Sequence, residues 1–308
     1  MSGTSEFAAQ SIANGSKSFA AAARLFDPRT RDSVVKLYAW CRHCDDVVDG
    51  QEAGSADRIE DERTPQERIA SLERDTALAF AGEAEGLHAS FRALSDVVRR
   101  HRLPRADADA HLAGFAMDVE GRTYETLDDL LLYCFRVAGV VGVMMARIMG
   151  VHHDGVLDRA SDLGLAFQLT NIARDVVDDA KAGRVYLPLS WLREEGLRPD
   201  GLFDPANKAA VARLRRRLVE AAEPYYASAR IGIDALPPRS AWAVGSAFGI
   251  YRAIGLNLVA KGEGAFGQRV STTKPEKMLH VVRGFWMAAF RGGGTEPRDL
   301  GLWTRERR

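Results

Sequence analysis

The sequence contains little cysteine, with only Cys41, Cys44 and Cys134 among its 308 residues. Three thiols are too few, and odd in number, for a disulfide framework, so reduced cysteines are expected. The first ten residues, MSGTSEFAAQ, lack the basic segment and apolar stretch of a secretory signal. Long hydrophobic runs are also missing, because the longest, Val137 to Ala146, is about half of a bilayer span. A cytoplasmic protein without a membrane anchor is therefore expected.

An excess of charge of either sign is absent, because Lys plus Arg and Asp plus Glu both total 42. Proteins that bind nucleic acid usually present a basic field, which this balance does not provide, so no nucleic-acid partner is expected. The chain is 46% hydrophobic and 27% charged, which is typical of a soluble globular protein with a buried core. Any polyanionic ligand must then be held by a local cluster of cations.

Strand-like alternation of apolar and polar residues is nearly absent, and so is the βαβ rhythm of an α/β fold. Apolar residues recur instead at helical spacing in the segments Val34 to Val48, Leu87 to Val98, Leu130 to Met149, Ala160 to Val177, Val211 to Ala222 and Trp242 to Val259. This pattern predicts an all-α bundle. We expect a single domain over residues 1–308.

Two pairs of aspartates share the same spacing on predicted helices. Asp45 and Asp49 are one helical turn apart, as are Asp175 and Asp179, so each pair places two carboxylates side by side. Like charges at this spacing repel each other, and each pair costs stability unless a cation lies between them. A solvated acidic face would explain one such pair, but two pairs on apolar helices favour a site that binds cations.

Magnesium suits these pairs. It prefers hard oxygen ligands, keeps several waters and is usually held by one or two carboxylates together with substrate phosphates. Two facing acidic helices would then trap a diphosphate through bound metal ions. Arg42, Arg174 and Arg184 lie near the aspartates in the sequence. Their guanidinium groups are suited to neutralising the charge that grows on a leaving group.

Three other motifs lack the context that their usual function needs. Cys41 and Cys44 form a C-x-x-C pair, but they lie within a helix and one further cysteine exists, so zinc or thioredoxin chemistry is disfavoured. Gly262 to Gly267 matches G-x-G-x-x-G, yet it follows a helix rather than a strand, which rejects a dinucleotide fold. His152 and His153 fit a loop or a helix start better than a ligand pair. For the aromatic residues of the apolar helices, core packing is the default and a lipid-chain tunnel is the alternative.

A series of motifs follows one another along the chain: Lys17-Ser-Phe19, Tyr38-Ala-Trp-Cys-Arg-His-Cys-Asp-Asp-Val-Val-Asp49, Tyr133-Cys-x-x-Val-Ala-Gly-x-Val-Gly142, Phe167-Gln-Leu-Thr-Asn-Ile-Ala-Arg-Asp175, Arg184-Val-Tyr-Leu-Pro188, Tyr251-Arg-x-Ile254 and Arg269-Val-Ser271. In this order they resemble the head-to-head prenyl synthases, a family that comprises squalene, dehydrosqualene and phytoene synthases. Further stretches look like those of bacterial carotenoid-pathway members: Gly114-Phe-Ala-Met-Asp118, Arg239-Ser-Ala-Trp242 and Ser271-Thr-Thr-x-Pro-Glu-Lys277. The resemblance covers a core of about residues 14–290 and leaves 291–308 as a tail that we expect to be flexible.

The resemblance implies a single-domain helical bundle of isoprenoid-synthase type with a central cavity. It also implies a magnesium or manganese site whose ligands are Asp45, Asp49, Asn171, Asp175 and Asp179. The implied reaction joins two geranylgeranyl diphosphates head to head through a cyclopropyl intermediate, prephytoene diphosphate. Because the reaction ends in loss of a proton, no NAD(P)H is expected.

Residue roles carried over from the family fall into two sets. The implied catalytic residues are Asp45, Asp49, Asp175, Asp179, Tyr133 and Arg174. The implied contacts with substrate or diphosphate are Lys17, Ser18, Phe19, Tyr38, Arg42, Gln168, Asn171, Arg184, Tyr186, Tyr251 and Arg269. Tyr133 and Tyr251 suit the handling of a cation or a proton, because an aromatic face attracts positive charge. Lipophilic substrates and products also imply transient contact with a membrane surface and with other enzymes of a carotenoid pathway.

Three alternatives differ from this expectation in observable ways. A chain-elongating prenyltransferase should carry a second DDxxD where this chain has Asn171-Ile-Ala-Arg-Asp175. A squalene, dehydrosqualene or hydroxysqualene type of synthase shares the first half-reaction and acts on farnesyl diphosphate. A non-catalytic helical interaction protein would have no reason to keep two repelling acidic clusters. Metal-dependent release of diphosphate separates that protein from all of the enzymes.

Overall fold

The computed structural model describes residues 3–15, 17–50, 62–292 and 296–305. Within these ranges every regular element is helical and no strand occurs, which confirms the predicted all-α class. The α-helices are α1 (Gly3–Gly15), α2 (Lys17–Ala23), α3 (Pro28–Asp49), α4 (Pro65–Ala81), α5 (Ala89–His101), α6 (Arg105–Val119), α7 (Leu127–Cys134), α8 (Val140–Ile148), α9 (Asp154–Lys181), α10 (Leu189–Glu194), α11 (Lys208–Ile233), α12 (Pro238–Lys261) and α13 (Lys274–Ala289). One π-helical turn, η1 (Phe135–Gly139), and the 3-10 turns η2 (Pro199–Phe203), η3 (Pro205–Asn207) and η4 (Gly262–Ala265) complete the described elements.

The two ends of α3 are set by its sequence. The Asp27 side chain accepts hydrogen bonds from the backbone N–H groups of Arg29 and Thr30 at 3.0 and 3.1 Å, and Pro28 occupies the first helical position. The helix ends at Gly50, whose φ of 65° is a left-handed conformation that glycine adopts without strain. These boundaries place both aspartates of the first pair in the last turns of α3.

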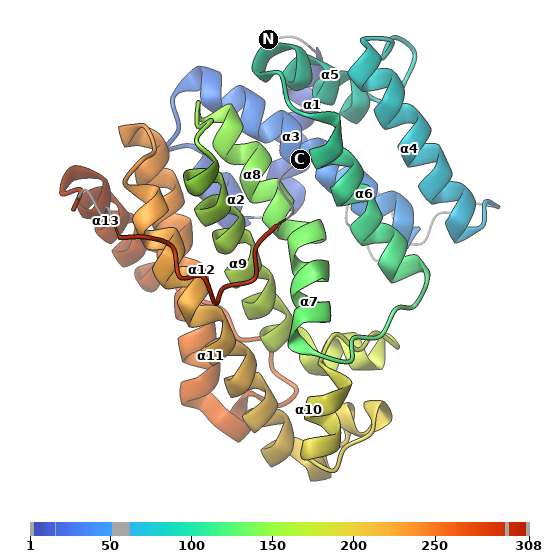
Figure 1. The fold of residues 1–308 in the computed structure, drawn as a ribbon, viewed down its shortest axis with the longest axis vertical. Coiled ribbons are helices and arrows are strands. Elements are labelled where there is room, and N and C mark those ends of the chain that lie inside the picture. The colour runs from blue at the N-terminus through green and yellow to red at the C-terminus, as the bar shows by residue number, and fades with distance from the viewer. Residues whose placement is uncertain (1–2, 16, 51–61, 293–295, 306–308) are drawn as a thin grey trace.

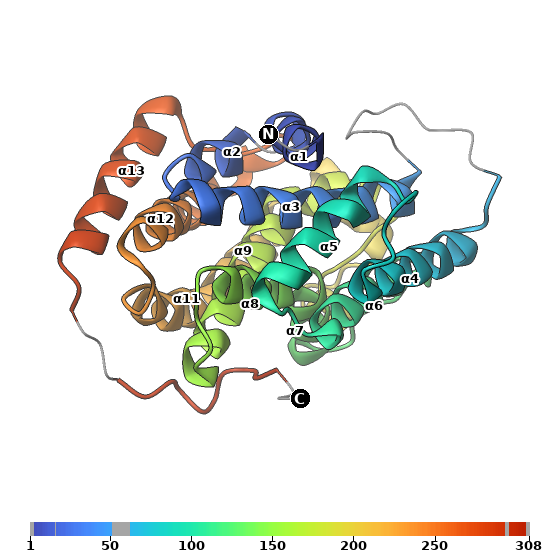
Figure 2. The same cartoon turned by 90° about the horizontal axis from the view of Figure 1, so that it is seen from above.

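Helix α9 lies at the centre of the bundle, with α8, α11 and α12 packed along it (Figure 1). In the view from above, α3 crosses over these helices, and α4, α5 and α6 gather on one side of the molecule (Figure 2). Helix α13 packs on the outer side of α12 at the opposite edge. The first pair of aspartates on α3 and the second pair on α9 are therefore carried by two crossing helices.

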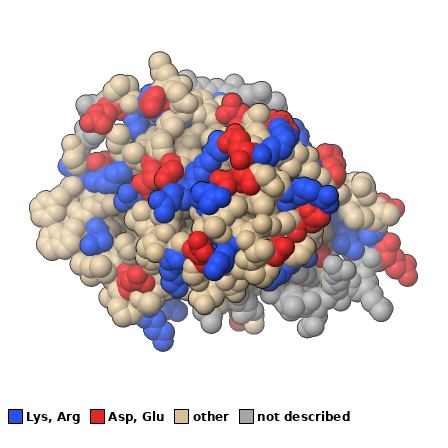
Figure 3. Space-filling view, turned by 90° about the horizontal axis from the view of Figure 1, so that it is seen from below, with Lys and Arg blue, Asp and Glu red and all other residues tan. Residues whose placement is uncertain are grey.

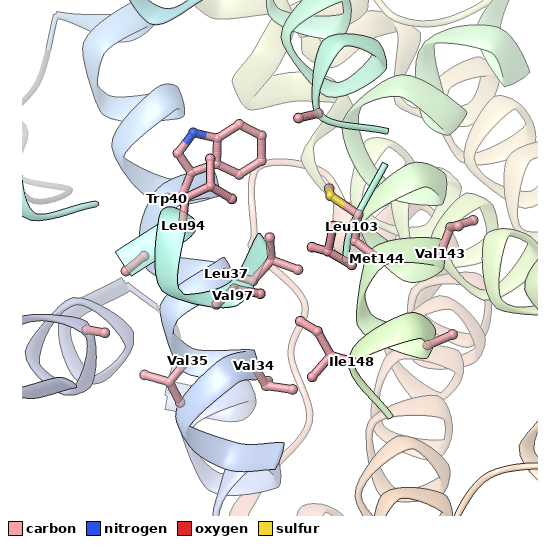
Figure 4. Packing of buried hydrophobic residues seen from close by; sticks show 14 of the residues in the cluster. Val34, Val35, Leu37, Trp40, Leu94, Val97, Leu103, Val143, Met144 and Ile148 are labelled. Carbon is pink, nitrogen blue, oxygen red and sulfur yellow. The ribbon is translucent and has the colours of Figure 1, made fainter. Parts of the chain in front are cut away.

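A buried apolar cluster fixes α3 against its neighbours (Figure 4). Leu37 and Trp40 of α3 are fully buried, as are Leu94 of α5 and Met144 of α8. Burial of one large apolar side chain contributes about 1.5–3 kcal/mol to stability. This packing holds the acidic end of α3 in a defined position relative to the rest of the bundle.

Two glycines let the backbone of α9 lie in direct contact with the backbone of η1 and α8. A Cβ atom at Gly142 would lie 2.4 Å from the carbonyl oxygen of Ala160, and one at Gly164 would lie 2.4 Å from that of Ala138. The apolar periodicity predicts one helix from Leu130 to Met149, but the structure inserts the π-helical turn η1 between α7 and α8. Such turns occur often at functional sites, and this one begins two residues after Tyr133.

The described part of the C-terminal tail is anchored by ion pairs, which differs from the flexible tail expected from residue 291 onwards. Arg298 donates to both carboxylate oxygens of Asp162 at 2.7 and 2.8 Å, and Asp162 is 1% exposed. Arg305 lies 2.9 Å from the buried Asp158, and Leu302 is also buried. The tail could not be recognised as anchored from its composition, because its partners are carboxylates on α9.

By length and composition, the segments Leu127–Ile148 and Pro238–Ala265 are apolar enough to cross a membrane. In the bundle, 50% and 39% of their apolar windows are buried, and both segments line the central cavity. A core and cavity lining account for the same composition.

Candidate active site

A cavity of about 850 Å³ lies between α3, α6, α8, α9, α11 and α12. One region is polar and is lined by Arg42, Asp45, Asn171, Arg174 and Arg269. The remainder is lined mainly by apolar side chains. On α9 the lining residues extend from Val156 to Arg174, which corresponds to about 27 Å along the helix. The cavity therefore suits a long apolar ligand with one charged end.

The first aspartate pair lies where α3 meets the cavity. Asp45 lines the cavity and pairs with Arg42 at 3.1 Å, and the other nitrogen of Arg42 holds the buried Asp46 at 2.7 Å. Burial raises the pKa of Asp45 to about 6, and the Asp49 and Asp46 carboxylates add to this rise, although Arg42 opposes it. A carboxylate in such surroundings gains most from a bound cation, because the cation offsets both causes of the shift.

The second pair has the same character. Asp175 accepts from its neighbour Arg174 at 2.8 and 2.5 Å and lies 3.4 Å from Arg269. Burial raises the pKa of Asp179 to about 7, and the Asp175 carboxylate adds to the rise. Asp178, between them in the sequence, is exposed. The helix thus turns two of these three carboxylates inwards.

Arg184, just after α9, connects the two pairs. Its guanidinium donates to Asp49 at 2.5 Å, and its positive charge lowers the pKa of both Asp45 and Asp179 against the effect of burial. Two acidic clusters about 130 residues apart in the sequence therefore face one another across one cation. This arrangement agrees with the facing acidic helices expected from the spacing.

The donor set fits magnesium held jointly with a diphosphate. Within the described ranges, no group of three or more His, Cys, Asp or Glu side chains is arranged to hold a metal by itself. Each pair supplies two hard oxygen ligands, and Asn171 adds an amide at the same polar region. Magnesium usually takes one or two carboxylates and completes its shell with water and substrate phosphate, so these donors suffice.

A tyrosine cluster surrounds Asp118 at the end of α6. Tyr133 donates its hydroxyl to one carboxylate oxygen at 3.0 Å, and Tyr186 donates to the other at 3.1 Å. The two rings stack with centroids 5.0 Å apart. Burial raises the pKa of Asp118, while both tyrosine hydroxyls oppose that shift. Asp118 and Tyr133 line the cavity, so the carboxylate fixes an aromatic face beside it.

The other predicted contacts divide according to their position. Five of them line the same cavity as Asp45: Tyr38, Gln168, Asn171, Tyr251 and Arg269. The ring of Tyr251 stacks on Phe167 at 4.2 Å. Tyr186 and Arg184 line a small separate recess together with Asp179. The side chains of Lys17, Ser18 and Phe19 lie outside the described residues.

The C-x-x-C, G-x-G-x-x-G and His152-His153 motifs lie in the helical and loop positions that the sequence predicts. Cys44 is fully buried in α3 and Cys41 lines the cavity, and burial raises the pKa of both thiols. Gly262 to Gly267 follows α12 and begins with the short 3-10 turn η4. His152 and His153 are exposed beside the start of α9.

Several cavity residues were not predicted, including Asp118, His111, Phe115 and Lys277. Asp118 gave a usable signal, because it is a lone acid near the end of the apolar stretch Gly114 to Met117. The other three carry no such signal. A histidine or phenylalanine on an apolar helix face reads as core whether or not the face borders a cavity.

Known proteins resemble this chain in both sequence and architecture. The model of the squalene/phytoene synthase family matches residues 12–276. The chain is 51% identical to the 15-cis-phytoene synthase of Pantoea ananas, with 97% of this chain and 96% of the relative covered. Identity to the 15-cis-phytoene synthase of Enterobacter agglomerans is 52%, with 94% and 98% covered.

A crystal structure of a dehydrosqualene synthase in complex with ligand matches with a TM-score of 0.81 at 27% identity, over 93% of this chain and 97% of that chain. The squalene synthase HpnC from Alicyclobacillus acidocaldarius matches with a TM-score of 0.71 at 25% identity, over 84% and 92%. The fold and the site together define a helical prenyltransferase. The chain belongs to the squalene/phytoene synthase family.

Proposed function

We propose that this protein is a 15-cis-phytoene synthase, which joins two geranylgeranyl diphosphates head to head and releases two diphosphates. The observation that carries the substrate class is a long, mainly apolar cavity whose polar region is lined by Asp45 of the first carboxylate pair and by three arginines, two of which contact Asp175 of the second pair. The chain length of the substrate is supported by relatives named 15-cis-phytoene synthase that are 51% and 52% identical over nearly the whole chain.

The polar region binds and orients the diphosphate of each substrate. Arg42, Arg174 and Arg269 line this region, and their guanidinium groups suit the phosphate oxygens. Asp45, Asp49, Asp175 and Asp179, with Asn171, would hold Mg²⁺ or Mn²⁺. When bound, the metal neutralises the diphosphate and so favours its departure with the electron pair of the C–O bond. The arginines stabilise the same developing charge from the protein side.

The apolar part of the cavity protects the allylic cation that ionisation leaves behind. The double bond of the second substrate attacks this cation, and loss of one proton closes a cyclopropane ring in prephytoene diphosphate. A second ionisation, a rearrangement and loss of a second proton give phytoene, so no hydride donor is needed. Phe167, Tyr251 and Tyr133 place aromatic faces at the cavity wall, where they attract positive charge without reacting with it. Exclusion of water by the apolar lining prevents capture of the cation as an alcohol.

Substrate and product chemistry also supports peripheral contact with a membrane. A long hydrocarbon product has little solubility in water, so it must pass to a bilayer or to an enzyme that consumes it. Transient contact with a membrane surface, and with other enzymes of a carotenoid pathway, is part of the proposed function.

Product analysis of the purified protein tests the reaction. With geranylgeranyl diphosphate and magnesium or manganese, we expect phytoene, released diphosphate and transient prephytoene diphosphate. Addition of NAD(P)H should change neither the rate nor the product. Much faster turnover of farnesyl diphosphate, or a product that requires reduced nicotinamide, would replace this proposal with a squalene or dehydrosqualene type of synthase.

A further inference from the structure

Helix α13 carries most of the exposed large apolar side chains of the described chain. Of nine such residues, six lie on α13 or on the residue that caps it. The most exposed are Met278 at 65%, Trp286 at 53% and Phe290 at 70%, and the others are Leu279, Val282 and Phe285. Residues 278, 282, 285 and 286 recur at helical spacing and so share one face. Contiguous exposed apolar surface of this kind marks an interaction site in a soluble protein.

The inner face of α13 is tightly packed, so the exposed face is held in place. A Cβ atom at Gly284 would lie 2.5 Å from the Ser246 hydroxyl oxygen of α12. Trp242 of α12 donates its indole N–H to the carbonyl oxygen of Val281 at 2.9 Å. Its ring also meets that of Phe285 edge to face at 5.5 Å. The outer face is therefore presented on a rigid helix.

Basic side chains accompany this apolar face. Lys274, Arg283 and Arg291 lie on or directly after α13, and none of these three exposed residues forms an ion pair within the described residues. Glu276 is the acidic residue of this helix, and its carboxylate is already hydrogen-bonded. It accepts from the backbone N–H of Thr273 at 2.6 Å, as part of the N-terminal capping box, and from the side-chain amide of Asn257 at 3.1 Å. The left edge of the molecule in Figure 3, the side on which α13 lies, shows mostly uncharged atoms, with basic groups and some acidic groups along it.

We propose that the outer face of α13 docks on the surface of an anionic lipid bilayer. The helix has 16 residues, or about 24 Å, which is too short to span a membrane and suits a position in the plane of the interface. Tryptophan is enriched at this depth of a bilayer, and basic residues attract anionic headgroups. A second copy of this chain is a poorer occupant, because it would bring the same cations together across the interface.

The docked orientation would bring the cavity to the membrane. Helix α12, against which α13 packs, supplies the cavity wall from Ala243 to Ile254. Lys277 belongs to α13 and lines the cavity as well. This inference deepens the peripheral contact proposed above, and it rests on that proposed function only for the identity of the lipophilic product.

Flotation of the full chain with vesicles tests the docking surface. Vesicles of phosphatidylglycerol and phosphatidylcholine, and of phosphatidylcholine alone, are mixed with protein without substrate or metal. We expect flotation with the anionic vesicles. Trp286→Ser with Phe290→Ser should weaken it at least about ten-fold through lost apolar burial. Arg283→Gln with Arg291→Gln should weaken it on anionic vesicles about ten-fold or more. The matched control is Phe203→Ser, an exposed apolar residue on η2, which should float like the wild type.

Each outcome bears on the proposal. Absence of flotation by the wild type, or unchanged flotation of both α13 variants, overturns it. A dimer in sedimentation that Trp286→Ser dissociates, without vesicle binding, assigns the face to a second copy instead. The Arg283 and Arg291 variant keeps the test sound if the aromatic variant fails to fold. Because no substrate is present, failure of docking leaves the proposed reaction untouched, and failure to make phytoene leaves the docking result valid.

Discussion

Arg184 Nη2 donates a hydrogen bond to Asp49 Oδ1 at 2.5 Å, and this contact joins the end of α9 to the end of α3. The same guanidinium lies near Asp179, whose pKa it lowers against burial. One cation thus offsets part of the repulsion between two acidic clusters. Burial and the neighbouring carboxylates still raise the pKa values of Asp45 and Asp179, to about 6 and 7, so a divalent ion would offset the repulsion that remains.

Neutralising the two carboxylates with raised pKa values should separate activity from stability. Asp45→Asn and Asp179→Asn are each expected to lower turnover about 100-fold or more, because each removes a ligand that stabilises the leaving diphosphate. The melting temperature without metal should hold or rise, because each change removes a partly buried charge that the neighbouring carboxylates disfavour. Thermal melts and steady-state kinetics at saturating magnesium check both parts.

Asp49 and Asp175, which are held by Arg184 and Arg174 at 2.5 Å, provide the contrast. Asp49→Asn and Asp175→Asn should lose activity to a similar extent, but their melting temperatures should fall slightly because Arg184 and Arg174 lose a partner. Near-normal turnover in any two of the four aspartate variants would contradict a metal site built from these residues.

Asp118 is predicted to position the tyrosine cluster. Asp118→Leu leaves the hydroxyls of Tyr133 and Tyr186 without their acceptor, so we expect a lower melting temperature and a fall in kcat larger than any change in KM. Asp118→Asn keeps one acceptor oxygen, so its melting temperature and its kcat should both lie closer to those of the wild type. Equal kinetics for the two variants would mean that the carboxylate serves stability alone.

Anchoring of the tail should be measurable as stability. Arg298→Gln leaves Asp162 buried without its cation, and the free energy of unfolding should fall by about 3 kcal/mol. Arg198→Gln breaks an exposed pair with Asp200 and should change little, which makes it the matched control. Urea unfolding of both variants measures the difference. Equal stability of Arg298→Gln and the wild type would show that the tail is not held by this pair.

Acid sensitivity is expected from His111, which is 2% exposed. Burial lowers its pKa to about 4, against the backbone contact with the Arg136 carbonyl that raises it. In the unfolded chain the imidazole takes up a proton near pH 6.5, whereas in the folded protein it stays neutral until about pH 4. The contribution of His111 to stability is therefore complete above pH 6.5 and declines as the pH falls towards 4. Between pH 8 and 5 the wild type should lose about 2 kcal/mol more stability than His111→Gln. The exposed variant His152→Gln should parallel the wild type in urea unfolding, and a parallel curve for His111→Gln would refute the assignment.

The thiols should be dispensable for chemistry. Cys41→Ser with Cys44→Ala is expected to keep most activity with a modest loss of stability, because burial raises the pKa of both thiols and keeps them protonated. Metal analysis of the wild-type protein is the companion measurement. Stoichiometric zinc whose removal abolishes turnover would overturn this prediction.

Local patterns in the sequence determined the helical class, the aspartate pairs and the family. Helical periodicity and the spacing of Asp45 with Asp49, and of Asp175 with Asp179, depend on residues within one or two turns, so they can be read without a fold. The resemblance in turn rests on motifs that follow one another in order along the chain. The residues around the C-x-x-C and G-x-G-x-x-G motifs were also sufficient to exclude a zinc site and a dinucleotide fold, because both motifs lie within or directly after a predicted helix.

Tertiary packing decided the features that join distant segments. The contacts of Arg184 with Asp49, of Tyr133 and Tyr186 with Asp118, and of Arg298 with Asp162 link residues separated by 135, 15, 68 and 136 positions. Each partner alone is an ordinary polar residue, because its role comes from what the fold places against it. The same reason hides the exposed face of α13 in the sequence, since an apolar stripe on a helix predicts burial until the structure shows which stripe faces the core.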